Sequence, residues 1–171
     1  MPNAFETGHR KVIPAVLAYL EREGQVLMLL RNVKAGDYHQ GKYNGLGGKL
    51  EPDESPREAA RREVQEEAGV DLPARAYRLL GTLQFPNFKP QKGEDWVVWV
   101  FTAQLTPSQQ AWPKGPEGTL EWIPKSKVLD LNLWQGDRQF IPHVLANRPF
   151  AGTIWYQGED VVRHEVEALT F

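Results

Sequence analysis

The sequence predicts an α/β fold, a mixed β-sheet with helices packed on it. Two observations carry this prediction: apolar runs of strand length recur along the chain, and two segments, 55–69 and 134–148, have helical patterns. Strands mixed with helices are typical of layered folds, in which each helix buries its apolar side against a sheet. The chain has 171 residues, 41% of them hydrophobic, so we expect one domain spanning residues 1–171.

Short apolar runs bounded by turn residues mark the strands. The first two runs are separated by the turn-like sequence EREG and predict a β-hairpin, and the last two flank GED at 158–160 and predict another. The predicted strands are 12–20, 25–31, 77–85, 95–105, 119–124, 152–157 and 161–169.

Two connections between these elements have a composition of their own. The stretch 32–45 is glycine-rich, polar and aromatic, which predicts a loop lying over another part of the fold. The stretch 86–94, PNFKPQKGE, predicts a second loop that carries proline and lysine.

The helix at 55–69 has both a start and a stop signal. Ser55 is the expected N-cap, Pro56 occupies the first helical position, and Glu58 completes a Ser-x-x-Glu capping box. Gly69 follows the last turn, where a glycine ends many helices.

The composition excludes several classes of protein. The net charge is −2, and the six tryptophans are scattered without a basic stripe, which argues against polymeric nucleic acid as the partner. The absence of cysteine excludes disulfides and fits a reducing compartment. No apolar signal core or membrane-spanning run is present. We therefore expect a cytoplasmic protein, monomer or homodimer, that binds a small molecule and no membrane.

Three carboxylates crowd the last turn of the first helix. Glu63, Glu66 and Glu67 are three and four residues apart, so they share one face. Their repulsion costs about a few tenths of a kcal/mol per exposed pair, and the negative helix C-terminus adds to it. A hard cation such as Mg2+ would remove the conflict. The alternative is a solvated acidic face relieved by three neighbouring arginines, Arg57, Arg61 and Arg62.

A longer pattern favours the metal site. Gly48 is followed after five residues by Glu54, and after seven more by REVQEEAGV at 62–70, with apolar residues at Val64 and Val70. This pattern fills every position of the Nudix signature, and the chain resembles the Nudix hydrolases. The resemblance implies an α/β/α sandwich and an enzyme in which water attacks a phosphoric anhydride of a nucleoside diphosphate derivative.

The resemblance also implies the metal ligands. Glu63, Glu66 and Glu67 match the carboxylates that hold Mg2+, with Mn2+ as an alternative ion, and the Gly48 carbonyl would complete the shell. One of Glu66 or Glu67, or a carboxylate from a distant loop, would orient and deprotonate the water. Such ions neutralise a diphosphate and lower the pKa of bound water.

Further residues are expected to support this centre. Glu54 and Arg62 would pair and brace the helix. Glu117 matches a loop position near the metals in many relatives, as a further ligand or base, although it is equally a plain loop acid. Arg31 or Lys34 would hold the distal phosphates, unless each is simply solvated.

Substrate residues are sought outside the signature. Asn44 would read a base with its paired donor and acceptor groups, or it is a turn asparagine. Tyr38 and Phe85 would stack on a ring, or they belong to the core. Trp134 and Asp137 would form a wall and a polar contact of a purine pocket, or they staple and cap a helix.

Three segments, YNGLGGK, LWQGDRQFIP and GTIWYQGED, resemble those of enzymes that hydrolyse oxidised purine nucleoside triphosphates such as 8-oxo-dGTP. Asn44, Trp134 and Asp137 fall on base-contacting positions of that group, and Asp137 would hydrogen-bond the base, protonated in an apolar pocket. The first acid of a consecutive pair is replaced by Gly136. The resemblance implies a diphosphatase that yields monophosphate and pyrophosphate and cleanses the nucleotide pool.

Two other functions remain open. Pro86 lies where ADP-ribose or nucleotide-sugar diphosphatases carry a characteristic proline, which keeps that activity as the alternative. A nucleotide-binding module without activity would be expected to lose signature carboxylates, and this sequence retains all of them.

Overall fold

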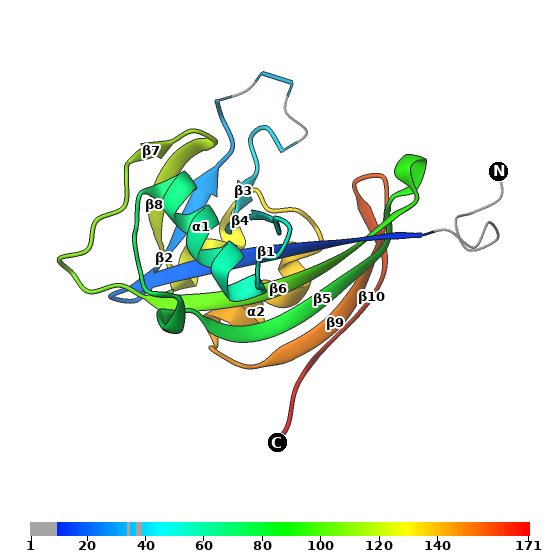
Figure 1. Cartoon of the computed structure of the whole chain (residues 1–171). Helices are drawn as coiled ribbons and strands as arrows, with labels where there is room; N and C mark the ends of the chain where they lie inside the picture. Colours follow the sequence, from blue (N-terminus) through cyan, green and yellow to red (C-terminus); the bar gives the residue numbers. More distant parts are fainter. Residues whose placement is uncertain (1–9, 34, 37–38) are drawn as a thin grey trace.

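The computed structural model describes residues 10–33, 35–36 and 39–171, and in them a mixed ten-stranded sheet carries a helix on either face (Figure 1). The strands are β1 (Lys11–Arg22), β2 (Gln25–Leu30), β3 (Tyr43–Asn44), β4 (Leu46–Lys49), β5 (Arg78–Lys89), β6 (Glu94–Gln104), β7 (Lys114–Gly115), β8 (Gly118–Pro124), β9 (Phe150–Gln157) and β10 (Asp160–Ala168). The helices are α1 (Pro56–Ala68) and α2 (Asp137–Leu145), with short 3-10 helices η1 (Ala74–Ala76), η2 (Pro90–Lys92) and η3 (Lys125–Asp130).

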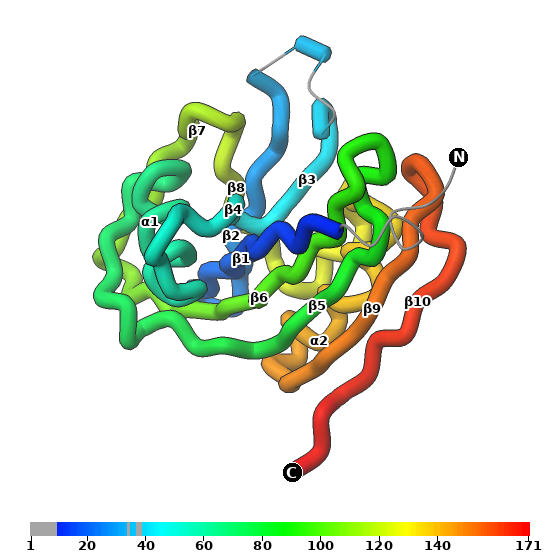
Figure 2. The backbone as a smooth tube through the Cα atoms, turned by 45° about the vertical axis from the view of Figure 1, so that its right-hand side comes forward, coloured from blue at the N-terminus to red at the C-terminus, as the bar shows by residue number. Residues whose placement is uncertain are grey.

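The strand order is β10-β9-β5-β6-β1-β2-β8-β7, with β3 paired to β2 and β4 paired to β1. The β1–β6 and β5–β9 pairs are parallel and the others are antiparallel, so the predicted mixed sheet is confirmed. The tube in Figure 2 shows the sheet curving from β8 to β10. None of the described helices is long and apolar enough to cross a membrane.

Strand β1 is buried on both faces and so divides two cores. Val16, Ala18 and Leu20 contact the cluster beneath α1, whereas Ala15 and Tyr19 contact the cluster on the α2 side. Successive side chains of a strand point to opposite faces, which explains why this segment is apolar without alternation. The helices contribute Ala59, Ala60, Val64 and Ala68 to the first cluster and Phe140, Ile141 and Val144 to the second.

Strand β1 also changes partner along its length. Residues 15–18 pair with β4, whereas Glu21 and Arg22 pair with β2. As a result β4, which carries two adjacent glycines, lies beside the middle of strand β1. Residues 50–55 connect it to α1.

The first helix forms as its signals predict. Ser55 accepts a hydrogen bond from the Glu58 N–H at 3.2 Å, and the Glu58 carboxylate accepts one from the Ser55 N–H at 2.8 Å. Pro56 stands at the first position, and Gly69 ends the helix in the left-handed conformation with φ 69°. The capping box is thus complete.

The predicted loop at 86–94 is wrong over its first half. Strand β5 continues to Lys89, and only η2 and its flanking residues form the turn. The register breaks between the pairs Phe85↔Trp96 and Lys89↔Glu94. A bulge of this kind leaves residues unpaired, so Pro86 stays in the strand without removing a ladder hydrogen bond.

Two other boundaries differ from the sequence prediction. The loop at 32–45 ends in strand β3 rather than continuing to 45, because Tyr43 and Asn44 pair with β2. The helix predicted at 134–148 spans only Asp137–Leu145. Trp134 therefore precedes α2 in a turn, in which its carbonyl accepts a hydrogen bond from the Asp137 N–H at 3.1 Å.

Replacing Ser55 by alanine removes one half of the capping box and is expected to destabilise the protein by about 1 kcal/mol, a typical value for an N-cap. Thermal unfolding measures this as a lowered Tm. The exposed Ser126, in η3, gives the matched control Ser126→Ala. An unchanged Tm for Ser55→Ala, or an equal loss for both variants, would contradict the role of the box.

Candidate functional site

The end of β4 brings backbone against the carboxylates of α1. The Gly47 N–H donates a hydrogen bond to Glu67 Oε2 at 3.3 Å. A Cβ atom on Gly48 would lie 2.4 Å from Glu63 Oε1. Only glycine at 48 therefore allows the Glu63 carboxylate to lie directly against the backbone of this strand.

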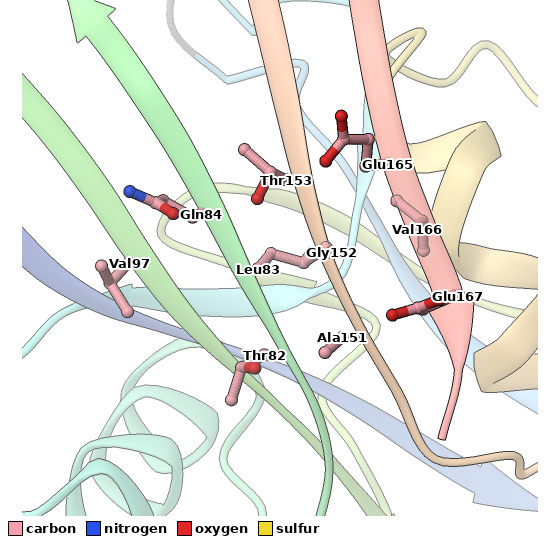
Figure 3. A pocket seen from close by; sticks show the side chains of 10 residues that line it. All are labelled: Thr82, Leu83, Gln84, Val97, Ala151, Gly152, Thr153, Glu165, Val166 and Glu167. Atoms are coloured by element: carbon pink, nitrogen blue, oxygen red, sulfur yellow. The ribbon is translucent and has the colours of Figure 1, made fainter. Parts of the chain in front are cut away.

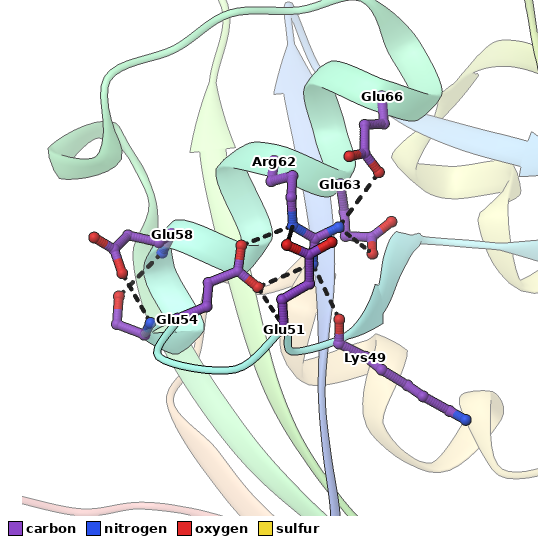
Figure 4. A network of polar contacts seen from close by, with 8 residues as sticks. Lys49, Glu51, Glu54, Glu58, Arg62, Glu63 and Glu66 are labelled. Atoms are coloured by element: carbon purple, nitrogen blue, oxygen red, sulfur yellow. Dashed lines mark hydrogen bonds and ion pairs between the residues drawn. The ribbon is translucent and has the colours of Figure 1, made fainter.

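Arg62, on helix α1, binds to the segment between β4 and the helix (Figure 4). Its Nε and Nη2 donate to the two oxygens of Glu54 at 2.7 and 2.9 Å, and Nη2 also donates to the Lys49 carbonyl at 3.1 Å. These bonds hold the pKa of the Glu54 carboxyl below its usual value. The predicted Glu54–Arg62 pair is thus present, as the bidentate geometry that arginine and carboxylate prefer.

The same arginine also contacts two of the three glutamates of the last helical turn. Its Nη1 contacts Glu63 Oε1 at 2.9 Å and Glu66 Oε2 at 3.3 Å. The Glu66 side chain is 56% exposed, whereas Glu67 is buried. Glu66 does not join Glu63 and Glu67 in one cluster in this structure, and the role of the three carboxylates as metal ligands stays a prediction. No three acidic or histidine side chains of the described residues form a metal-binding cluster.

Two of the carboxyls do meet. Burial raises the pKa of Glu67 well above its usual value, and the adjacent Glu63 carboxylate raises it further, while the Gly47 N–H acts in the opposite direction. A buried pair of like charges is unfavourable unless a cation or a proton neutralises it. With hard oxygen donors and a glycine backbone beside them, these residues fit a divalent cation.

Glu117 and Arg31 form one ion pair. The turn between β7 and β8 places Glu117 close enough to Glu67 to raise its pKa, and Glu117 Oε2 lies 3.1 Å from Arg31 Nη2. The two residues were predicted to act on metal and phosphate separately. In this pair the positive charge of Arg31 and the negative charge of Glu117 lie side by side, near Glu67. Lys34 lies outside the described residues.

A pocket of about 380 Å³ adjoins the signature. Five predicted substrate residues line it, namely Arg31, Asn44, Phe85, Trp134 and Asp137, and so do Gly47 and the predicted metal ligand Gly48. Tyr38 lies outside the described residues. The substrate residues and the signature backbone therefore share one pocket.

Trp134 is held in the pocket wall by the loop before β3. Its Nε1 donates a hydrogen bond to His39 Nδ1 at 2.9 Å, and the two rings meet edge to face at 5.2 Å. Lys42 Nζ lies 5.1 Å from the centre of the indole ring. Asn44, on β3, donates a long hydrogen bond to the Lys42 carbonyl at 3.5 Å. His39 and Lys42 thus contact two of the three predicted base-contacting side chains, Trp134 and Asn44.

Another part of the pocket lining is an aromatic wall, and the sequence did not identify most of it. Phe85 contacts Phe88 at 5.2 Å and Tyr156 at 6.2 Å between ring centres, and Phe88 contacts Trp96 at 5.6 Å. Phe88 falls in the segment that was predicted to be a loop. Phe88 reaches the pocket because strand β5 continues to Lys89. Pro86 is not among the lining residues.

Asp137 is the first residue of α2 and lines the same pocket. Burial raises the pKa of its carboxyl from 3.8 to about 7, although Lys42 and Arg138 lower it. An acid of this kind changes charge near neutral pH and can either donate or accept a hydrogen bond there.

A second hollow, of about 710 Å³, lies on the sheet face formed by β5, β9 and β10 (Figure 3). It is lined by Thr82, Leu83, Gln84, Val97, Ala151, Gly152, Thr153, Glu165, Val166 and Glu167. None of these residues belongs to the signature or to the first pocket, which is therefore the candidate active site.

Comparison with known families decides the class of this site. A model of the NUDIX domain matches residues 11–144. The chain belongs to the Nudix family. It is a Nudix hydrolase, an enzyme that cleaves phosphoric anhydrides, and hydrolases of this family bind small nucleotides and generally use a divalent metal such as Mg2+.

Individual relatives extend this result. A Danio rerio protein described as oxidized purine nucleoside triphosphate hydrolase is 29% identical over 154 residues, 90% of this chain and 93% of that protein. The crystal structure of a mutator MutT protein from Bacillus halodurans has a TM-score of 0.77 at 26% identity, covering 91% of this Nudix hydrolase and 97% of the other chain. The NUDIX domain of Shewanella oneidensis NrtR, solved with ADP ribose, shares the fold, with a TM-score of 0.63 at 20% identity over 81% of this chain and 89% of that one.

In the absence of metal and at neutral pH, Glu67→Gln is expected to raise the Tm, because the raised pKa of Glu67 means that folding must protonate this carboxyl at a free-energy cost that the neutral amide avoids. A gain of about 1 kcal/mol corresponds to roughly 2–4 °C for a chain of this size. Adding Mg2+ should raise the Tm of the wild type and leave that of the variant nearly unchanged. An equal Mg2+ effect on both proteins would contradict the role of Glu67 in holding the ion.

Asp137→Asn is expected to gain stability over the wild type as the pH rises. The folded-state pKa lies above the ordinary one, so the folded protein binds the extra proton between about pH 4 and 7, and the carboxyl lowers stability progressively through that window. Denaturant unfolding at pH 5 and 8 measures the difference. The exposed Asp130 supplies the control Asp130→Asn, and a pH-independent difference for Asp137→Asn would refute the burial of its charge.

Proposed function

We propose that this Nudix hydrolase is a metal-dependent nucleoside triphosphate diphosphatase that converts 8-oxo-dGTP or related oxidised purine nucleotides to monophosphate and pyrophosphate. The observation that carries the proposal is the single pocket that Asn44, Trp134 and Asp137 line together with Gly47 and Gly48 of the signature strand. The likeness to the Danio rerio hydrolase supports it. Its role would be to remove damaged nucleotides from the pool.

The phosphate end requires neutralisation of charge. Glu63 and Glu67 would hold the cation with the Gly48 carbonyl, and the bound ion would neutralise the diphosphate and lower the pKa of the attacking water. Glu66 would join them by leaving its 3.3 Å contact with Arg62, which keeps both bonds to Glu54.

Proton transfer and phosphate binding fall to the surrounding side chains. The exposed Glu66 carboxylate or the buried Glu67 carboxyl would take the proton from the attacking water. Arg31 would contact the phosphates by exchanging its Glu117 partner. Phosphoryl transfer depends mainly on positioning and on charge stabilisation of this kind.

The base end requires hydrogen bonds in an apolar setting. The purine ring would lie between the wall of Phe85 and Phe88 and the wall of Trp134 and Asn44. Asp137 would bond the Watson–Crick edge, and above its raised pKa of about 7 the ionised carboxylate accepts N–H donors of the base. A buried site built to hydrogen-bond one edge rejects analogues that leave its polar groups unpaired.

The experiment compares turnover of 8-oxo-dGTP, dGTP and ADP-ribose at equal concentration with Mg2+. We expect the highest kcat/KM for 8-oxo-dGTP, with pyrophosphate as the second product. Glu67→Gln should lower kcat by about 10²–10⁴-fold, the usual effect of removing a positioned catalytic group. Glu167→Gln, far from the signature on β10, is the matched control.

Two outcomes would contradict the proposal. Preferred cleavage of ADP-ribose would establish the alternative that Pro86 suggested. Near-normal Mg2+-dependent turnover by Glu67→Gln would refute the assignment of the carboxylates.

A further inference from the structure

Tyr156 reaches from β9 to the peptide that opens α2. The Gly136 N–H donates a hydrogen bond to the Tyr156 hydroxyl at 2.7 Å. A Cβ atom on Gly136 would lie 2.3 Å from that hydroxyl oxygen and 3.0 Å from the ring carbon Cζ. The tyrosine hydroxyl therefore occupies the space that any side chain at 136 would need.

The same tyrosine is part of the pocket. Its ring stacks on Phe85 with an angle of 30° between the planes and meets the edge of Phe88 at 5.8 Å. Tyr156 and Asp137 both line the pocket, whereas the buried Gly136 does not. Tyr156 thus lies between the aromatic wall and the segment that carries the acid.

A second link fixes this segment to the same hairpin. Gln135 donates to Asp160 Oδ1 at 2.8 Å, and its Oε1 accepts from the Val161 N–H at 2.8 Å. Together with the bond from Gly136 to Tyr156, these contacts clamp residues 135 and 136 onto the β9–β10 hairpin. The position of the next residue, Asp137, depends on them.

The chemistry at the base end follows from this arrangement. Asp137 is the one acid among the described residues that line the pocket. Two adjacent carboxyl groups could exchange donor and acceptor roles by moving one proton between them. A single carboxyl group with no second acid among the described lining residues has no such exchange. A lone carboxylate best matches two adjacent N–H donors, as on the Watson–Crick edge of guanine, whereas adenine presents an acceptor beside its amino group.

We propose that Tyr156 sets the base specificity of this pocket, by excluding a side chain from position 136 and by positioning Asp137, so that the pocket selects guanine-type over adenine-type nucleotides. This inference rests on the proposed function. It assigns to Tyr156 a role that none of the signature residues performs.

The first test compares Tyr156→Phe with the wild type on 8-oxo-dGTP, dGTP and dATP. Loss of the hydroxyl leaves the buried Gly136 N–H without its acceptor and loosens Asp137. We expect KM for the guanine nucleotides to rise about tenfold with kcat nearly unchanged, and the ratio of guanine to adenine kcat/KM to fall. Fluorescence titration with 8-oxo-dGTP and no metal should show the same loss of affinity.

The matched control is Tyr43→Phe. This change also removes a phenol hydroxyl with one short bond, to Glu121 Oε2 at 2.6 Å, but Tyr43 does not line the pocket. Its KM values and its guanine-to-adenine ratio should equal those of the wild type.

A double-mutant cycle separates specificity from simple loss of folding. Gly136→Ala alone should weaken guanine nucleotides more than Tyr156→Phe, because the new methyl group meets the hydroxyl. In the double variant the methyl group enters the space left by the hydroxyl, so KM should recover toward that of Tyr156→Phe. The remaining ring contacts at 3.0 and 3.1 Å require a shift of only a few tenths of an ångström.

The outcomes are distinguishable. An active wild type whose Tyr156→Phe variant keeps its KM and its base preference overturns this inference and leaves the proposed function standing. Additive losses in the cycle overturn it as well. A wild type that cleaves no purine nucleoside triphosphate overturns the proposed function and this inference with it.

Discussion

The arrangement of the candidate active site depends on the guanidinium of Arg62. It donates to both oxygens of Glu54 and to the Lys49 carbonyl, and so closes the turn between β4 and α1 onto the helix. That closure brings Gly47 and Gly48 against the carboxylates of Glu63 and Glu67. Bidentate charge-assisted bonds are among the strongest that side chains make, so the loop, strand and helix of the signature behave as one unit. This unit fixes the position of the acidic residues at the end of helix α1.

The parts of the fold that the sequence predicted are those determined by neighbours along the chain. The capping box of Ser55 and Glu58 and the stop at Gly69 involve residues of a single helix, and a local pattern is sufficient to find them. The pair of Glu54 and Arg62 spans eight residues of the same motif. Asn44, Trp134 and Asp137 were found through resemblance and Phe85 through its aromatic side chain, and the structure brings all four to one pocket.

What the sequence did not predict depends on contacts between distant segments. Phe88 was assigned to a loop together with Pro86. Pro86 remains in strand β5 because the strand has a bulge there, and this bulge arises from pairing with β6, which no local sequence pattern marks. His39 and Tyr156 lie 95 and 20 residues from their hydrogen-bond partners, and no local pattern marks either one. Helical spacing predicts where the backbone of Glu66 lies, whereas the direction of its carboxylate depends on the contact with Arg62. A contact map would have been needed to find these features.

The ion pair between Arg31 and Glu117 has a consequence for the order of events at the site. An arginine already paired with a carboxylate takes up a phosphate only by exchanging partners, and the released Glu117 carboxylate then adds to the negative potential around Glu63 and Glu67. Under the proposed function, each arriving nucleotide would thereby increase the attraction of the site for a cation. Thermodynamic linkage makes this effect reciprocal, so a bound cation would favour the nucleotide by the same factor. An enzyme built in this way would hold neither ligand firmly until both are present.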